Sequence, residues 1–148
     1  MEAIKLSPYN LHASKCLVLG FGNCGQVLAT KLKNLECNVT VSCRNPYFGA
    51  CARTYGINYV PLNHVYNCIQ DFLFIFNTIP AKILTKRYLD LIKKEALIID
   101  IASEPGGIDL EYASIINLNA VNIPGIPGKV AAISSAQILY DYINEVLC

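Results

Sequence analysis

The stretch Gly20-Phe21-Gly22-Asn23-Cys24-Gly25 has the spacing G-x-G-x-x-G. It directly follows the apolar run 16–19 and opens the segment 22–35, whose apolar residues recur at helical spacing with Lys31 and Lys33 on the opposite face. A glycine fingerprint between a buried strand and an amphipathic helix is typical of a loop that binds the pyrophosphate of a dinucleotide.

Each glycine of this stretch has a physical task in such a loop. Gly20 permits the tight turn, Gly22 lets the backbone approach a pyrophosphate, and Gly25 lets the helix pack closely on the sheet. The pyrophosphate then meets unpaired N–H groups and the positive end of the helix dipole. The alternative is a glycine-rich turn without a ligand. We predict that the dinucleotide is bound by Gly20, Phe21, Gly22, Asn23, Cys24 and Gly25.

Short apolar runs alternate with amphipathic segments along the rest of the chain. Strands are predicted at 16–19, 39–43, 57–60, 72–77, 97–101 and 120–123. Helices are predicted at 22–35, from Asn45-Pro46 onward, and at 62–69, 82–94, 109–116 and 129–147. Strands that are apolar on both faces and separated by helices predict an α/β fold, a doubly wound parallel sheet of about six strands of the Rossmann type. Residues 16–148 are expected to form the dinucleotide-binding domain, and residues 1–15 a connecting segment.

Composition narrows the class of protein. The chain has 148 residues, the size of one domain, with 53% hydrophobic and 16% charged residues, the opposite balance to a disordered tail. A formal charge of +1 gives no electrostatic footprint for nucleic acid or an anionic membrane. No apolar run approaches the roughly 18 residues of a membrane span, and the first fifteen residues leave no room for a signal-peptide core. We therefore expect a cytoplasmic protein that binds neither nucleic acid nor membrane.

The seven cysteines include no C-x-x-C pair, and the two histidines do not lie at metal-ligand spacing. Together with the absence of an export signal, this predicts reduced thiols, several of them buried, and no metal site. Cys24 is expected to fill space at the phosphate loop, with a redox role as the alternative.

The end of the second predicted strand indicates which dinucleotide binds. An NAD site usually has an Asp or Glu there, about 20 residues past the glycine motif, that binds the ribose hydroxyls. This chain has no acid in that position and reads Cys43-Arg44-Asn45 instead. A guanidinium binds a 2′-phosphate through a planar, charge-assisted fork, and the helix starting at Asn45 adds a second N-terminus. We predict NADP (NADPH) as the cofactor; the alternative is that Arg44 is a solvated loop residue.

Three further strand ends should meet in the same crevice, because ligands in such sheets bind outside the carboxyl ends of the strands. Their predicted contacts with the cofactor are Asn77, Thr78, Ile79, Ala102, Ser103, Pro124 and Gly125. Lys129, beside the last of these loops, is a candidate partner for a substrate carboxylate. The alternatives are three ordinary turns and a solvated lysine. No His, Glu or Tyr is placed as a general acid or base, so the catalytic residue is unknown.

Read in order, these segments resemble the C-terminal NADP-binding domain of the family formed by the A subunits of dipicolinate synthase. The most specific parts of the resemblance are Pro105-Gly106-Gly107 and Pro124-Gly125-Ile126-Pro127-Gly128. Stretches 18–22, 38–41 with Arg44, 77–81, 97–103, 129–131 and 137–139 also match.

The resemblance implies an oxidoreductase of sporulating bacteria that converts a dihydrodipicolinate-type compound to dipicolinate with NADP. It also implies work in the mother-cell cytoplasm alongside a flavoprotein-like B subunit. Members of that family have an N-terminal lobe across the cleft, which this chain lacks. The stretch 132–136 also departs from the family's proline- and lysine-containing sequence, which puts substrate contacts from the last helix in doubt.

Two other classes of function remain as hypotheses. A non-catalytic module that binds or senses NADP(H) is favoured by the missing lobe. Methyl transfer from S-adenosylmethionine also uses a glycine loop, but it normally needs a ribose-binding acid where this chain has Arg44. A homo-oligomer, a dimer or a higher assembly, is also expected, because the cleft-facing surface around Ile126 and Pro127 would otherwise expose apolar area.

Overall fold

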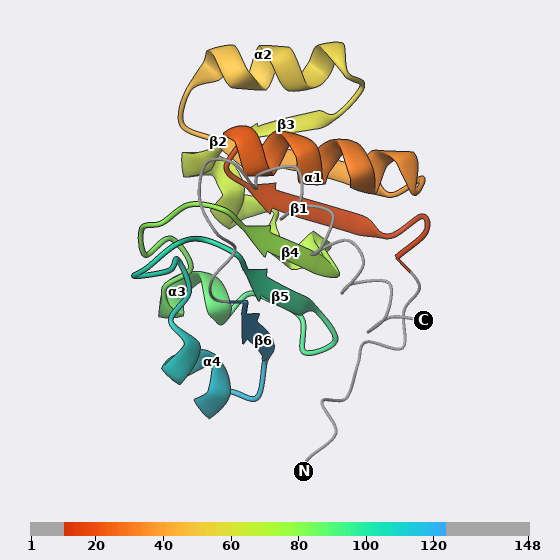
Figure 1. Ribbon diagram of the computed structural model, residues 1–148. Helices are drawn as coiled ribbons and strands as arrows, with labels where there is room; N and C mark the ends of the chain where they lie inside the picture. The colour runs from red at the N-terminus through yellow and green to blue at the C-terminus, as the bar shows by residue number, and fades with distance from the viewer. Residues whose placement is uncertain (1–10, 124–148) are drawn as a thin grey trace.

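The computed structural model describes residues 11–123 and contains a six-stranded sheet (Figure 1). The strands, in the spatial order β3-β2-β1-β4-β5-β6, all pair in parallel. They are β1 (Lys15–Leu19), β2 (Asn38–Cys43), β3 (Asn58–Pro61), β4 (Phe74–Asn77), β5 (Leu97–Asp100) and β6 (Asn119–Asn122). The predicted doubly wound Rossmann-type sheet is therefore confirmed.

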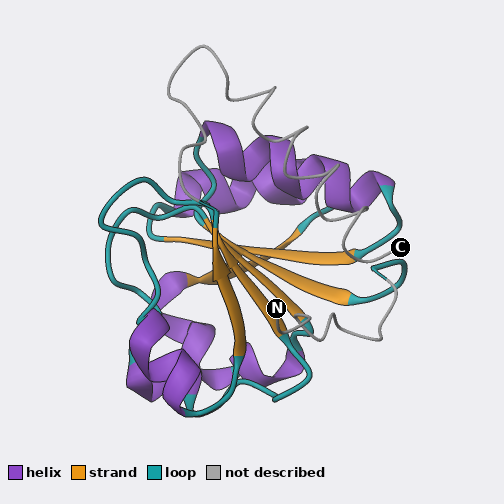
Figure 2. Cartoon of the chain, turned by 60° about the horizontal axis from the view of Figure 1, so that its bottom comes forward, coloured by secondary structure: helices purple, strands orange, loops and turns teal. Residues whose placement is uncertain are grey.

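Helices cover both faces of this sheet, as Figure 2 shows. One face carries α1 (Asn23–Asn34) and α2 (Pro46–Thr54). The other carries the 3-10 helices η1 (Leu62–Asn67) and η2 (Ile69–Asp71) with α3 (Lys86–Leu89) and α4 (Leu110–Ile115). Side chains of β1 point alternately to the two faces of the sheet. Cys16 and Val18 lie in the core under α1, whereas Leu17 and Leu19 lie in the core on the opposite face.

Two of the predicted helices differ in the structure. Residues 62–69 form 3-10 turns, and the segment 82–94 is α-helical only over α3. Its first residues pair with a distant loop instead: the N–H groups of Ile83 and Leu84 both donate to the carbonyl of Gly107, and Leu84 forms an isolated parallel bridge with Ile108. Because of this long-range pairing, the helix begins only at Lys86.

The register of the strands brings their carboxyl ends to one edge of the sheet. Leu19 pairs with Ser42 on one side and with Asn77 on the other, and Asn77 pairs in turn with Asp100. The chain leaves β1 for β2 and later returns on the other side of β1 as β4, so the order of the strands reverses beside β1. A ligand crevice is expected at such a reversal.

Within residues 11–123, none of the helices is long and apolar enough to span a bilayer. Leu11, in the predicted connecting segment, is buried in the core under α1. The predicted helix 129–147 and the loop residues Pro124, Gly125 and Lys129 lie outside the described residues.

Candidate functional site

The glycine loop turns sharply between β1 and α1, and its first and third glycines are required by close packing. Gly20 has φ +95°, a conformation that a side chain strains, and a Cβ there would clash with the Thr78 hydroxyl. A Cβ on Gly25 would clash with the carbonyl oxygen of Gly20 and lie 2.9 Å from its carbonyl carbon. The loop is held from both sides, because the Gly20 N–H donates to Ser42 O (2.7 Å) and the Thr78 N–H donates to Leu19 O (2.9 Å).

Gly22 differs from the other two because space around it is open. It has an ordinary φ of −75°, it is exposed, and a Cβ there would meet no atom within 4 Å. Gly22 is also the N-cap of α1, and no side chain caps this end of the helix. An uncapped N-terminus with an empty approach over a glycine fits the phosphates of a dinucleotide.

The other residues of the fingerprint have separate roles in the structure. Phe21 is buried in the core beneath α1, and its carbonyl oxygen accepts a bond from the Gln26 side chain (3.0 Å). Asn23 is exposed in the first turn of α1, and Cys24 beside it is half-buried. Their side-chain contacts with a cofactor stay predictions.

A buried carboxylate connects two loops at this edge of the sheet. Asp100 is 1% exposed and Asn77 is 0% exposed, and the Asn77 Nδ2 donates to Asp100 Oδ1 over 2.9 Å. The N–H of Ala102 donates to the same oxygen (3.1 Å), and the N–H of Gly107 donates to Asp100 Oδ2 (2.8 Å). Asp100 thus accepts three bonds, which satisfies a charge that burial would otherwise penalise.

Two glycines make room for this network. Gly106 has φ +79°, and a Cβ there would lie 2.9 Å from Asp100 Oδ2. A Cβ on Gly107 would clash with the Asn77 amide and come within 2.8 Å of Ile79 O. The Pro105-Gly106-Gly107 loop is therefore shaped by the need to close over the Asp100 carboxylate.

The structure places each predicted residue after β4 and β5. The Asn77 side chain points inward, binding both backbone groups of Ile79 besides Asp100. Thr78 and Ile79 are half-buried, and the Thr78 hydroxyl donates to Leu19 O (2.8 Å). Ala102 is buried, whereas Ser103 is exposed. Thr78, Asn77 and Ala102 thus have structural roles here, and the cofactor contacts predicted for this set remain untested.

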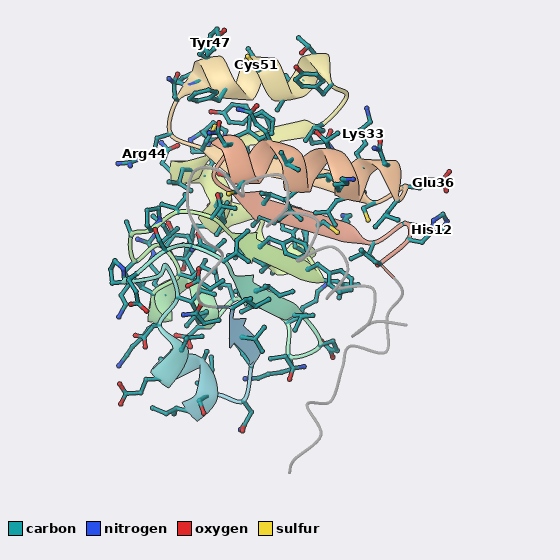
Figure 3. The ribbon with its side chains drawn as sticks, in the orientation of Figure 1. His12, Lys33, Glu36, Arg44, Tyr47 and Cys51 are labelled. Carbon is teal, nitrogen blue, oxygen red and sulfur yellow. The ribbon has the colours of Figure 1, made fainter. Side chains whose placement is uncertain are left out.

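The end of β2 presents a cation that pairs with no carboxylate in the described part of the chain. Arg44 is exposed, and Figure 3 shows it projecting at the opposite end of the molecule from His12 and Glu36. Asn45 caps α2 as predicted, accepting a bond from the Tyr47 N–H (3.0 Å). Burial raises the pKa of the Cys43 thiol, so this neighbour stays uncharged at neutral pH.

Arg44 lines a hollow of about 400 Å³ with residues from η1, from the loop after β4 and from α3. The lining consists of Arg44, Leu62, Asn63, Lys82, Ile83, Thr85 and Tyr88. A larger hollow of about 800 Å³ lies by the start of β1 and carries both signs of charge, with Lys15, Asp71, Lys93 and Glu95 among its lining. The smaller hollow is the one at the carboxyl edge, where the fold places a ligand.

Sequence reasoning did not single out Asp100 or Lys82, which the structure places at this edge of the sheet. Asp100 carries a signal, because it is a charged residue in an otherwise apolar predicted strand, level with Asn77 at the end of the neighbouring strand. Lys82 has no such signal in the sequence, because the periodicity of its segment predicts an ordinary helix with Lys82 at its start. In the described part of the chain, no three His, Cys, Asp or Glu side chains come together in a way that could hold a metal ion.

Comparison with known proteins adds the family. Residues 2–105 match the model of the D-isomer specific 2-hydroxyacid dehydrogenase NAD-binding domain. The chain belongs to this family. An NAD-binding domain of this kind, with the glycine loop described above, supports a nicotinamide dinucleotide as the cofactor and an oxidoreductase-like protein.

Individual relatives are similar over nearly the whole chain. The A subunit of dipicolinate synthase from Bacillus subtilis (strain 168) is 33% identical over 147 residues, which are 99% of this chain and 50% of that protein. The crystal structure of the same subunit from Bacillus halodurans superposes with a TM-score of 0.78 at 31% identity, covering 95% of this chain and 48% of that one. The crystal structure of the A chain of dipicolinate synthase from Bacillus subtilis superposes with a TM-score of 0.78 at 33% identity, covering 94% of this chain and 47% of that one. These matches confirm the predicted resemblance, and the chain spans about half the length of these relatives.

Proposed function

We propose that this chain is the NADP-binding half of an oxidoreductase of the dipicolinate synthase type. The single observation that supports NADP over NAD is the end of β2, where exposed Arg44 takes the position of the usual ribose-binding acid. A carboxylate there would repel a 2′-phosphate, whereas a guanidinium pairs with it.

The residues of the chain hold and orient the cofactor in this proposal. The backbone at Gly22 and the first turn of α1 bind the pyrophosphate, and Arg44 with the N-terminus of α2 binds the 2′-phosphate. The Asp100 network fixes the loops after β4 and β5 at the nicotinamide end. A bound nicotinamide supplies hydride transfer, and the protein supplies orientation and electrostatics.

The substrate and partner are inferred from the relatives. A dihydrodipicolinate-type dicarboxylate oxidised to dipicolinate during sporulation is the reaction that similarity to dipicolinate synthase supports. Lys129 is proposed as a contact for a substrate carboxylate, and the proposed partner in the cytoplasm is a B-type subunit. The acid–base residue is proposed to come from an N-terminal lobe like that of the longer relatives.

The choice of cofactor is tested by titrating NADPH and NADH into the wild type and Arg44→Ala in a calorimeter. Charge-assisted bonds contribute about 1.5–3 kcal/mol, and about 1.4 kcal/mol is a factor of ten. The wild type should therefore bind NADPH about tenfold to a hundredfold tighter than NADH, and Arg44→Ala should weaken NADPH alone. Equal wild-type affinities, or a variant that weakens both cofactors alike, would make Arg44 a bystander.

A second candidate is a module that senses NADP(H) without turning over a substrate. The residues described at the carboxyl edge, from Gly22 to the Asp100 network, account for binding of a dinucleotide, which is all that such a module requires. The same binding residues serve both candidates, so turnover and not affinity separates them.

A further inference from the structure

We propose that Lys82 is a second cation of the cofactor site, which acts with Arg44 on the 2′-phosphate of NADP. This inference rests on the proposed function and adds a specificity-determining residue to it. Lys82 lies in the loop between β4 and α3, more than thirty positions from Arg44 in the sequence, and both side chains line the same hollow of about 400 Å³.

The hollow carries positive charge without compensation. Among the described residues that line it there is no Asp or Glu. Neither Arg44 nor Lys82 forms an ion pair with a carboxylate of residues 11–123. Two such cations that face one hollow at the carboxyl edge attract an anion. A bound anion also relieves the repulsion between the two positive charges.

The rest of the lining fits a phosphorylated nucleoside. Leu62 and Ile83 offer apolar surface for a base, and Asn63, Thr85 and Tyr88 carry amide and hydroxyl groups that hydrogen-bond a ribose. The volume falls within the range of small-molecule sites. The cations from two different loops would then distinguish a 2′-phosphate from a 2′-hydroxyl.

The packing of the β4–α3 loop fixes the place of Lys82. Immediately after it, the N–H groups of Ile83 and Leu84 donate to Gly107 O over 3.0 and 2.9 Å. Leu84 is buried, while Lys82 itself is exposed. A substitution at Lys82 therefore removes the charge without disturbing the core.

The test uses adenosine 2′,5′-bisphosphate and adenosine 5′-monophosphate, which report on the adenosine end alone, together with NADPH and NADH. Calorimetric titrations compare the wild type with Lys82→Gln, Lys82→Arg and Arg44→Ala. Lys82→Gln should weaken the bisphosphate and NADPH about tenfold, Lys82→Arg should retain most of the affinity, and the monophosphate and NADH should change less than about twofold.

Lys86→Gln is the matched control. Lys86 lies in the adjacent α3, its ammonium 4.9 Å from the centre of the Tyr112 ring, and it does not line the hollow. Removing its charge should leave the ratio between bisphosphate and monophosphate unchanged. An equal loss in Lys86→Gln and Lys82→Gln would show a general field effect and overturn the assignment.

The outcomes separate this inference from the proposed function. If the wild type does not prefer NADPH, the proposed cofactor fails and the role of Lys82 fails with it. If the preference exists and depends on Arg44, but Lys82→Gln leaves it intact, only the inference about Lys82 is wrong. A Lys82→Gln variant that weakens all four ligands alike would place Lys82 elsewhere on the nucleotide and would also overturn it.

Discussion

At the scale of single residues, the Asp100 carboxylate determines the shape of the proposed nicotinamide end. It accepts bonds from the Asn77 side chain and from the backbone of Ala102 and Gly107, so the loops after β4 and β5 are tied together. All three partners are donors, and the Asp100 side chain is nearly inaccessible to water. Such a network requires an acceptor at both oxygen positions.

Asp100→Asn is expected to lower the free energy of unfolding by about 2–3 kcal/mol, because the new NH₂ group would face a donor and the charge-assisted bonds are lost. Urea denaturation measures the change. The matched control is Asp109→Asn at the N-cap of α4, where the side chain accepts from the Tyr112 N–H and Asn caps equally well. Two variants of equal stability would show that the Asp100 network contributes little.

Residue roles are predicted unevenly by the sequence. The roles of Gly20 and Gly25 follow from the motif, because its spacing requires a tight turn at Gly20 and close packing of the helix on the sheet at Gly25. The inward direction of Asn77 does not, since it depends on the register that sets Asn77 beside Asp100. Each strand end taken alone indicates a ligand contact, and only the pairing of neighbouring ends shows that these two side chains bind each other.

At the scale of elements, α2 connects the sheet to the predicted phosphate site. Asn45 caps it through the Tyr47 N–H, and Pro46 occupies its first position, as the sequence predicted. The cap fixes where the helix begins, and so fixes the backbone that follows Arg44.

Asn45→Ala should destabilise the protein by about 1 kcal/mol through loss of the cap, while Asn45→Asp should keep the stability. The choice of cofactor should be affected by Asn45→Asp. Its new carboxylate, beside Arg44, should weaken the binding of NADPH relative to that of NADH. Thermal unfolding and calorimetric titration check the two parts. An Asn45→Asp variant with an unchanged preference would place the 2′-phosphate away from this helix.

The strands were predicted more accurately than the helices. All six appear within a few residues of their expected positions. The four central strands β1, β2, β4 and β5 are buried on both faces, and an apolar run of that length has few alternatives to a strand in an α/β domain. The segment 82–94 has helical periodicity, yet Leu84 pairs with Ile108 in the loop after β5. Local periodicity carries no information about such a long-range pair.

At the scale of the whole molecule, the proposed function makes this chain one side of a cleft. Its relatives of the dipicolinate synthase type are about twice as long, and the similarity covers about half of their length. In a protein of these 148 residues alone, a dinucleotide on the carboxyl edge of this sheet would lack the part of the site that the other half of a longer relative is proposed to supply. Orientation and exclusion of water, which a closed site provides, would be missing.

These 148 residues alone are therefore expected to bind cofactor but to turn over dihydrodipicolinate at least ~100-fold more slowly than the full-length Bacillus subtilis relative. The nicotinamide absorbance follows the reaction. Turnover comparable to that of the longer protein would show that the catalytic groups lie within this chain.

The most direct test of the account is the affinity of NADPH for the wild type and for Gly22→Val, measured by calorimetry with circular dichroism as the control for folding. Gly22 has an ordinary φ, and no atom lies within 4 Å of the position that a Cβ would take, so Val should leave the fold intact while occupying the approach of the pyrophosphate. The account predicts that wild-type protein binds NADPH and that Gly22→Val does not. Unchanged affinity in a folded Gly22→Val protein would contradict it.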